Sequence, residues 1–460
     1  MERTTYMNKF KIGYASTDIT PHLGIAISGY YVPRFAKEIL DGLEVNALSL
    51  SCDGDCVIWV SIDNCMIDKT VVDRIAKRVQ TLVGIPAYNV IVSVTHTHTA
   101  PFLTGSVFGF EPDEDEVLRY TDFVIERAAE AARLAYSDML PAKMGYAVVR
   151  APERIAYIRR YKMKDGSTMT CPPVNDPNID HPLGELDQRV NVLRFDREGG
   201  ESIVLLNYGL HADTVGGEMI SADWPGQLRK TLDKALDGVK CMVICGAQGD
   251  VGSTNIHPTA SDMNDTEISF DNEMKSPGMA RFVGRALAGA VLEVYDKVNY
   301  TDVNDISVLR QTVAIPTNMP EPEDMPRAKE YKRLHDAGRD DLIPYTAMEL
   351  TTVVAEAARM CELEHGPEAI TMEMIGLRLG DVALIGIPGE PFTEVGVRIK
   401  EYGGFDLVMP CALTNGYYGY FPTRSAYEEG GYEARASKYR SGVAERLTEC
   451  GGKIIRALVN

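Results

Sequence analysis

The chain has 460 residues, of which 45% are hydrophobic and 25% are charged, so it can bury an ample core without disulfide bonds. Its net charge of −19 and its pI of about 4.9 argue against a general electrostatic attraction to nucleic acid or to an anionic membrane. We find no apolar run of the roughly 18 residues that a membrane-spanning helix needs.

The first regular unit is a strand pair, a helix and a further strand between residues 46 and 94. Two apolar strands flank the turn Asp53–Gly54. A helical pattern follows, with Asp68 as the expected N-cap and Gly84 as the stop. The strand Asn89–Val94 has no polar face, which is typical of a sheet covered on both sides. This order predicts an α/β fold.

The same alternation recurs along the rest of the chain. Strands are expected at 202–211, 240–250, 368–390 (a pair) and 406–411, and helices at 223–236, 276–295 and 392–402. We therefore predict an α/β protein with mixed, largely parallel sheets covered by helices. Two polar stretches, Arg159–Pro182 and His257–Lys275, are expected to be long loops. Residues 1–460 are expected to form a single domain, with a helical insertion at 319–365.

Several predicted strands end in polar residues. His96 and His98 follow one strand, His211 follows another, and Glu390 follows a third. Ligands bind beyond the carboxyl ends of strands in α/β sheets, and imidazole with carboxylate suits Zn²⁺. Each signal has a plain structural alternative: His211 as a hydrogen-bonded strand end, Glu390 as a helix cap, and the nearby tyrosines as a packing cluster.

Five motifs in order resemble the catalytic domain of the neutral/alkaline (non-lysosomal) ceramidase family. They are THTHTAP (95–101), GLHADTVGG (209–217), GAQGDVGSTN (246–255), IPGEPFTEVG (387–396) and LTNGYYGYFPTRSAYEEGGYEA (413–434). The opening segment GYASTDITPHLGIAISGY (13–30) is also similar, so the resemblance spans about Lys11 to Tyr432.

The resemblance implies a zinc site and a set of residues around the substrate carbonyl. The implied zinc ligands are His96, His211, Glu390 and Tyr420. The implied catalytic residues are His98, Arg159 (with Arg160 as the rival register), Tyr432 and Ser253. Asp213 and Asp223 are candidates for orienting the ligand imidazoles, and capping of a helix is the alternative role of Asp223.

The sequence departs from the family pattern at three points. The segment that carries the family's serine reads Gly249 to Asn255 here and is one residue longer, so Ser253 need not occupy the serine position. Bulkier residues replace the glycines after the THTH motif. From this sequence we also expect neither the family's further C-terminal domain nor its usual secretion signal.

We therefore expect a zinc-dependent hydrolase that cleaves an amide (N-acyl) bond by metal-activated water. The alternatives are a metal-dependent hydrolase of an ester, lactone or sugar derivative, and a non-catalytic binding protein on the same scaffold. The expected partner is a small-molecule N-acyl substrate, with no nucleic acid and no stable membrane association. The cations Arg159, Arg160, Lys162 and Lys164 favour a substrate that is smaller and more polar than ceramide, with an anionic group, and a solvated charge cluster on an exposed loop is the alternative.

The cysteines and the N-terminus predict a cytoplasmic location. The nine cysteines are scattered and odd in number, which favours free thiols in a reducing compartment. The segment Met1–Phe10 has no apolar signal region.

Overall fold

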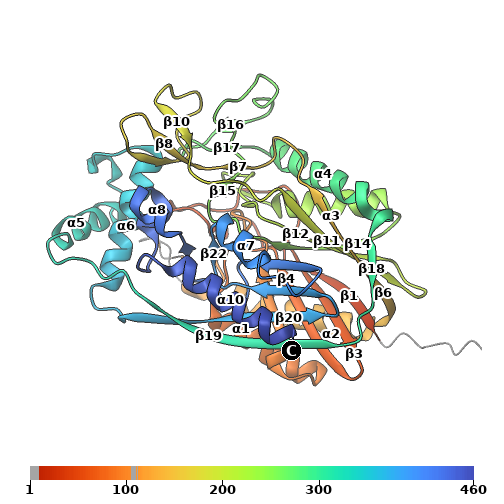
Figure 1. The fold of residues 1–460 in the computed structure, drawn as a ribbon. Helices are drawn as coiled ribbons and strands as arrows, with labels where there is room; N and C mark the ends of the chain where they lie inside the picture. The colour runs from red at the N-terminus through yellow and green to blue at the C-terminus, as the bar shows by residue number, and fades with distance from the viewer. Residues whose placement is uncertain (1–9, 105–109, 111, 460) are drawn as a thin grey trace, which may run out of the picture.

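The computed structural model describes residues 10–104, 110 and 112–459 (Figure 1). The first nine residues, which bear on the expected lack of a secretion signal, lie outside the described part. The chain folds into two sheets packed face to face, with helices on both outer sides (Figure 1). This αββα arrangement buries both faces of each sheet.

The larger sheet is mixed. Its end pairs, β12–β14 and β4–β5, are parallel, and the pairs between them are antiparallel. In sheet order its strands are β14 (Lys240–Cys245), β12 (Ile203–Tyr208), β11 (Arg189–Arg197), β6 (Leu140–Arg150), β1 (Lys11–Asp18), β3 (Glu44–Cys52), β4 (Asp55–Ile62) and β5 (Val90–Val94), with β18 (Asn299–Thr301) beside β6.

The smaller sheet packs against the larger one through an apolar layer. Trp59, Ile91 and Met242 of the larger sheet meet Leu384 and Met409 of the smaller one, and all five are almost fully buried. The strands of the smaller sheet are β19 (Ile306–Pro316), β20 (Ala369–Leu379), β21 (Val382–Gly386) and β23 (Leu407–Cys411), in that order, and its β21–β23 pair is parallel.

The prediction of an α/β fold with mixed sheets is confirmed, but the expected predominance of parallel pairs is wrong. Strand β5 and its neighbours are apolar on both faces because helices cover one face and the second sheet covers the other. An antiparallel strand in such a sandwich has the same sequence pattern as a buried parallel strand. The hairpin turns at Asp53–Gly54 and Gly380–Asp381 pair their strands antiparallel, as the turn residues predict.

Helices cover the outer faces of both sheets. The pairs α1–α2 and α3–α4 pack on the larger sheet, α7 and α10 pack on the smaller one, and α5 and α6 pack on each other (Figure 1). The helices are α1 (Lys69–Val83), α2 (Glu114–Ser137), α3 (Asp223–Ala235), α4 (Pro277–Val294), α5 (Met325–Asp336), α6 (Ala347–Leu363), α7 (Thr393–Lys400), α8 (Arg424–Glu429), α9 (Tyr432–Ala436) and α10 (Val443–Val459).

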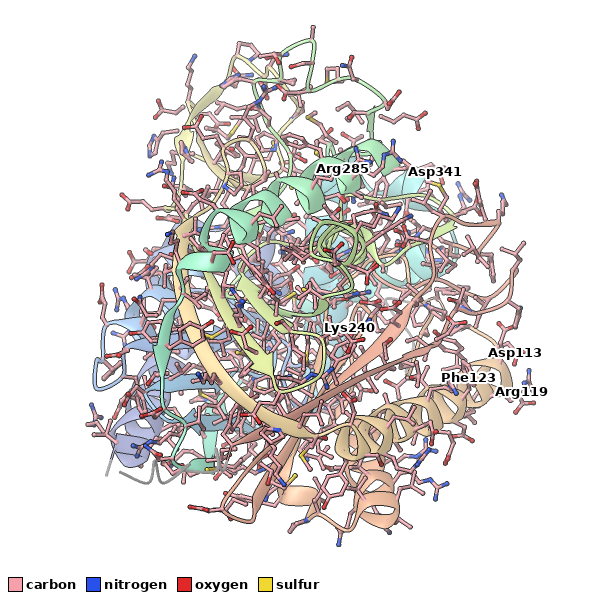
Figure 2. All side chains as sticks on the ribbon, turned by 90° about the vertical axis from the view of Figure 1, so that its right-hand side faces the viewer. Asp113, Arg119, Phe123, Lys240, Arg285 and Asp341 are labelled. Atoms are coloured by element: carbon pink, nitrogen blue, oxygen red, sulfur yellow. The ribbon has the colours of Figure 1, made fainter. Side chains whose placement is uncertain are left out.

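The expected helix ends are confirmed where the end residues have a specific conformation or bond. Gly84 ends α1 with a φ of 87°, which favours glycine. Ser276 caps α4, because its side chain accepts a hydrogen bond from the Met279 amide at 2.9 Å. The sequence analysis did not assign α2. Figure 2 shows Arg119 and Phe123 on its outer side and Asp113, its N-cap, at the start of the helix.

Both expected loops contain short strands. The segment 159–182 forms a three-stranded sheet, and 257–275 ends in a hairpin; Figure 1 shows both at one end of the molecule. The short strands are β8 (Arg160–Met163), β9 (Thr168–Thr170), β10 (Ile179–Pro182), β16 (Glu267–Ile268), β17 (Met274–Lys275), β2 (Glu38–Ile39) with β13 (Met219–Ile220), β7 (Tyr157–Ile158) with β15 (Val251–Gly252), and β22 (Glu390–Pro391) with β24 (Tyr420–Phe421). The segment 319–365 contains α5 and α6.

All nine cysteines lie in the described part of the chain and are free thiols. Most of them are buried, and Cys56 and Cys361 are partly exposed. Among the residues that the structure describes, we find no helix with the length and apolar character needed to cross a bilayer.

Asn415 joins the two sheets. It follows β23 of the smaller sheet and pairs with Val92 in β5, the last strand of the larger sheet. The Asn415 amide donates to the Val92 carbonyl at 2.7 Å, and the Val92 amide donates to Asn415 Oδ1 at 2.8 Å. Asn415 is buried and has a φ of 60°, a conformation that asparagine tolerates better than most residues. The side chain therefore completes the open edge of β5.

We predict that Asn415→Ala lowers the free energy of unfolding by about 2 to 5 kcal/mol. An orphaned buried amide costs about 1 to 3 kcal/mol, and a positive φ costs alanine about 1 to 2 kcal/mol more. Asn415→Gly also removes the acceptor, but glycine tolerates the positive φ. Its free energy of unfolding should therefore fall by less than that of the alanine variant. Denaturant unfolding of both variants tests this, and an alanine variant as stable as the wild type would show that the Val92 bond contributes nothing.

Candidate functional site

The segments that follow five strands meet at one place. They are the segments after β5, β12, β14, β21 and β23, which carry the motifs named from the sequence. The two ends of the larger sheet come together here, because Cys245 Sγ at the end of β14 donates to the carbonyl of Thr95 after β5 at 3.1 Å. The curvature of the sheet therefore brings His96 and His211 close together.

His96, His211 and Glu390 form a buried group that we call the His–His–Glu cluster. His96 Nε2 lies 3.1 Å from Glu390 Oε2, and His211 Nε2 lies 3.0 Å from the same oxygen. The three residues are at most 2% exposed. One nitrogen from each ring and one carboxylate oxygen thus converge, the arrangement found in groups that hold a metal ion.

The second ring nitrogen of each histidine fixes which atom faces Glu390. His96 Nδ1 lies 2.6 Å from the Cys65 carbonyl, and His211 Nδ1 lies 2.9 Å from the carbonyls of Gln248 and Val251. A carbonyl only accepts, so each Nδ1 carries the proton and each neutral ring points an Nε2 lone pair at the carboxylate. His211 Nε2 makes no hydrogen bond of normal geometry. Three electron-pair donors facing one another require a cation between them.

Without a metal, a proton takes that place. Burial opposes the charged form of His96, but the Glu390 carboxylate outweighs burial and holds the pKa of His96 well above its ordinary value. Burial also opposes ionisation of Glu390, yet His96 and His211 hold the pKa of its carboxyl well below the ordinary value. Burial, followed by the Arg159 charge, lowers the pKa of His211. The residues present therefore fit a divalent cation such as Zn²⁺.

Strand pairing brings Tyr420 to the cluster. Glu390 and Tyr420 are direct partners in the parallel pair β22–β24. The Tyr420 hydroxyl accepts a hydrogen bond from Arg159 Nη2 at 3.0 Å, and its ring lies edge-on to that of Tyr432, with centroids 5.5 Å apart. Burial and then Glu390 raise the pKa of Tyr420, so its hydroxyl is protonated in the absence of a metal.

His98 lies on the more exposed side of the cluster. Its Nε2 is 3.3 Å from His96 Nε2, and its side chain is 11% exposed, against 2% for His96. Burial and the neighbouring His96 lower the pKa of His98, so the ring is neutral. Cys65, His96 and His98 form a second group within ligand distance, but Cys65 Sγ approaches His96 Nδ1, whose proton is held by a carbonyl.

The structure separates the two candidate arginines. Arg159 donates to Tyr420, to the Gly249 carbonyl at 3.1 Å and to Glu433 at 2.8 Å, so it faces the cluster. Arg160 lies on the other side of Glu433, 3.7 Å from its carboxylate, where it stacks on Phe392 and donates to the carbonyl of Gly430 at 2.8 Å. Successive residues of a strand face opposite sides, which accounts for the separation.

Ser253 does not join the cluster. Gly252 in β15 faces Arg159: a Cβ built on Gly252 would lie 3.7 Å from Arg159 Cβ. The next residue, Ser253, lines a separate cavity with Arg154 and Tyr157. No hydrogen bond connects Ser253 with the His–His–Glu cluster among the described residues. Gly252 therefore faces Arg159, and Ser253, which the resemblance implies as a catalytic residue, lies outside the cluster.

The two candidate aspartates have different surroundings. Asp213 Oδ2 lies 3.6 Å from His98 Nδ1 and accepts hydrogen bonds from Tyr30 and Lys275. Asp223 is the first residue of α3 and accepts hydrogen bonds from the amides of Thr214 and Val215, both at 2.9 Å. Asp223 therefore fixes the loop after His211 and does not contact a ligand imidazole directly.

The structure adds residues that the sequence analysis did not assign to the site. Tyr417 donates to Glu390 Oε1 at 2.9 Å, and Glu433 holds Arg159. Tyr417 was visible as part of a tyrosine run, but nothing in the spacing selects it from its neighbours. The buried cation Lys275 lies in a predicted polar loop, and two of its partners, Tyr30 and Asp213, lie far away in the chain.

The expectation of an anionic substrate rests on cations of the loop 159–182. Two of them, Lys162 and Lys164, form hydrogen bonds within that segment, away from the cluster. Lys164 Nζ donates to the Pro177 carbonyl at 2.6 Å, and Lys162 Nζ donates to the Gly166 carbonyl, both on exposed parts of the β8–β10 sheet. These bonds brace the small sheet, so Lys162 and Lys164 are not part of the wall of the cluster.

The fold and the cluster together define an αββα protein in which strand-end loops surround a buried His–His–Glu group. Its fold is that of neutral ceramidase. It superposes on the neutral ceramidase from Pseudomonas aeruginosa with a TM-score of 0.71 at 17% identity, over 98% of this chain and 74% of that one. A ceramidase complexed with C2 gives a TM-score of 0.73 at 16% identity, over 98% and 75%.

No protein-family model matches the chain, and no curated protein matches it significantly in sequence. The resemblance to neutral ceramidases that the motifs indicate is confirmed at the level of the fold.

We predict that Gly249→Ala lowers the free energy of unfolding by about 1 to 3 kcal/mol, because overpacking displaces backbone. A Cβ at Gly249 would lie 2.6 Å from the Glu390 carbonyl oxygen, so β22 must move. Gly289→Ala is the matched control. Gly289 lies in α4, and a Cβ at this position would meet no atom within 4 Å. The free energy of unfolding of the control should rise by about 0.5 to 1 kcal/mol, because alanine is favoured over glycine inside a helix. Equal stabilities of the two variants in urea unfolding would refute the close contact.

Proposed function

We propose that the chain is a zinc-dependent hydrolase that cleaves the C–N amide bond of an N-acyl substrate. The observation that carries the proposal is the convergence of two imidazole lone pairs and one carboxylate oxygen in a buried site. Imidazole and carboxylate donors suit Zn²⁺, and catalytic zinc sites usually have three such ligands and an open position. The names of the structures that share the fold support an amide as the substrate, because ceramide is an N-acyl amide.

The proposed ligands are His96 Nε2, His211 Nε2 and Glu390 Oε2, with the Tyr420 hydroxyl as a fourth. The carbonyls that hold each histidine Nδ1 fix the ring orientation, and Tyr417 fixes the second oxygen of Glu390. A bound zinc ion supplies an activated water near neutral pH and polarises the scissile carbonyl.

The remaining residues bind the substrate carbonyl and move protons. His98 Nδ1 is buried without a hydrogen-bond partner, 3.6 Å from Asp213, so the neutral imidazole can accept a proton and pass it to the leaving amine. Arg159 and the Tyr432 hydroxyl lie beside Tyr420 and stabilise negative charge on the carbonyl oxygen. Gly252 lies beside Arg159 and Ser253 lines a separate cavity, so the proposed reaction does not use Ser253.

We extend the proposal to the organisation and location of the chain. Loops from both sheets build the cluster, which supports one catalytic domain with the α5–α6 pair as an insertion. The free, mostly buried thiols support a reducing compartment such as the cytoplasm.

We predict that His96→Ala loses stoichiometric zinc and all hydrolysis, because it removes one of three ligands around a buried cation. His181→Ala is the matched control, since that imidazole is 57% exposed on β10 and should leave zinc content unchanged. Elemental analysis of both purified variants measures the metal. Full zinc occupancy in His96→Ala would rule out the assigned ligand.

A second prediction concerns metal removal from the intact protein. Dialysis against a chelator should abolish amide hydrolysis, and one equivalent of Zn²⁺ should restore it. Hydrolysis that persists after complete metal removal, as measured on the same sample, would contradict a zinc mechanism.

A third prediction follows from the proposed compartment. Titration of thiols in denatured, non-reduced protein should find all nine cysteines free. A titration of freshly prepared protein that finds seven or fewer would show a disulfide and would argue against a reducing compartment.

A further inference from the structure

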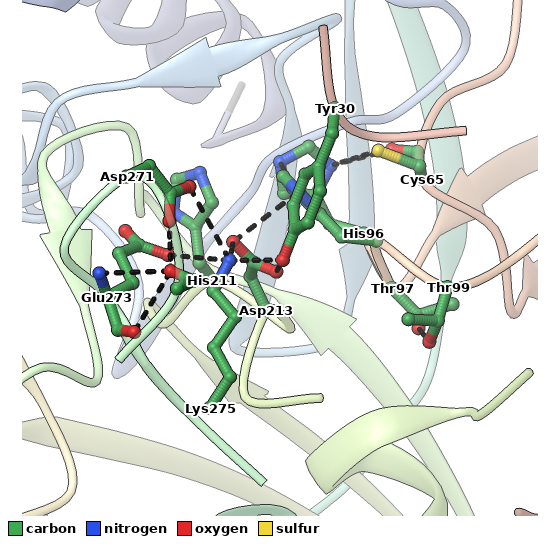
Figure 3. Close-up of polar contacts among 12 residues, drawn as sticks. Tyr30, Cys65, His96, Thr97, Thr99, His211, Asp213, Asp271, Glu273 and Lys275 are labelled. Carbon is green, nitrogen blue, oxygen red and sulfur yellow. Dashed lines mark hydrogen bonds and ion pairs between the residues drawn. The ribbon is translucent and has the colours of Figure 1, made fainter. Parts of the chain in front are cut away.

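A second polar group lies beside the His–His–Glu cluster, and we call it the Lys275 cluster. It consists of Tyr30, Asp213, Asp271, Glu273 and Lys275, all at most 9% exposed (Figure 3). Lys275 Nζ lies 2.6 Å from Asp213 Oδ2, 3.0 Å from Glu273 Oε2 and 3.7 Å from Asp271 Oδ2, and it also donates to the Tyr30 hydroxyl. Three carboxylates thus surround a single ammonium group.

The Lys275 cluster borders the more open side of the proposed zinc site. Asp213 lies 3.6 Å from His98 Nδ1, and the Tyr30 ring lies edge-on to the His98 ring, with centroids 5.8 Å apart. The side chains of His98, Asp271 and Glu273 are 10% to 13% exposed, whereas His96 and Glu390 are at most 2% exposed. The Lys275 cluster therefore flanks His98 on the side of the site where the side chains are less deeply buried.

The aromatic ring of Phe270 lies at the outer edge of the Lys275 cluster. We call the cluster and this ring together the wall of the site. Phe270 is 46% exposed, and its ring lies edge-on to Tyr30 with centroids 6.1 Å apart. Phe270, Asp271 and Glu273 all belong to the turn between β16 and β17. One hairpin therefore presents an apolar face and two carboxylates next to each other.

We propose that this wall binds the amine part of the substrate and that this part carries several hydroxyl groups; this inference rests on the proposed hydrolysis. The substrate is then an N-acyl amino sugar or a related N-acylated aminopolyol. A hydroxyl group both donates and accepts, so it can donate to Asp271 or Glu273 and accept from Lys275. The exposed Phe270 ring offers a surface for the C–H face of the sugar. A small set of polar groups beside an apolar surface is typical of small-molecule sites.

Other substrate chemistries fit this wall less well. A carboxylate or phosphate would approach three carboxylates that outnumber the ammonium group. A long alkyl chain would exclude water from Asp271 and Glu273 without replacing the hydrogen bonds of that water, which is unfavourable for a charged group. The wall thus selects for hydroxyl groups and against the sphingoid chain of a ceramide.

The first test compares three substrates with zinc-loaded enzyme: N-acetylglucosamine, N-acetylhexylamine and a short-chain ceramide in detergent. We expect kcat/KM to be at least about 100-fold higher for N-acetylglucosamine than for the other two, because a site built to bind hydroxyls strongly rejects analogues that lack them. Higher kcat/KM for ceramide or N-acetylhexylamine would overturn this inference and leave the proposed amidase intact. Failure to cleave any of the three would overturn both.

The second test changes the wall without changing the proposed ligands. Asp271→Asn should raise KM for N-acetylglucosamine by about tenfold or more, with kcat within about twofold, because hydrogen bonds to charged groups contribute about 1.5 to 3 kcal/mol. Zinc content and the kinetics with N-acetylhexylamine should not change. Glu267→Gln is the control, since it removes an exposed carboxylate from the same hairpin. An equal effect of Asp271→Asn on both substrates would reduce Asp271 to a structural role and overturn the inference.

Discussion

The structure depends on one electrostatic requirement: three buried electron-pair donors face one another and need a cation. Each imidazole has its Nδ1 proton committed to a backbone carbonyl, so neither ring can donate to Glu390 while neutral. Mutual repulsion of lone pairs in a site from which water is excluded is costly. A protein that retains this arrangement must supply either a proton or a metal ion, and two charges on a metal satisfy three donors better than one proton does.

The αββα architecture provides the rigid frame for that requirement. The donors come from three strand-end segments in two different sheets, so their positions depend on how the sheets are joined. Asn415 makes that joint by pairing with β5, and the close approach of Gly249 to the Glu390 backbone sets β22 against the segment after β14. Small changes in this frame displace a donor, which explains why the motifs concentrate at the strand ends.

The sequence was sufficient for some of these features and insufficient for others. His96, His211 and Glu390 were predictable because each follows an apolar strand in an ordered set of motifs. The direction of strand pairing was not predictable, because strands buried between two layers have no polar face in either orientation. The choice between Arg159 and Arg160 depended on which side of a strand faces the cluster, and the displacement of Ser253 depended on the pairing of β15 with β7. The Lys275 cluster joins residues from Tyr30 to Lys275 through tertiary contacts that spacing cannot reveal.

The most direct test of the account is a crystal structure of the protein as purified with zinc, with diffraction data collected on both sides of the zinc absorption edge. The account predicts an anomalous difference peak about 2.0 to 2.2 Å from His96 Nε2, His211 Nε2 and Glu390 Oε2. The absence of a peak at that position, with the three side chains still converging as described, would contradict the central claim that the cluster is a metal site.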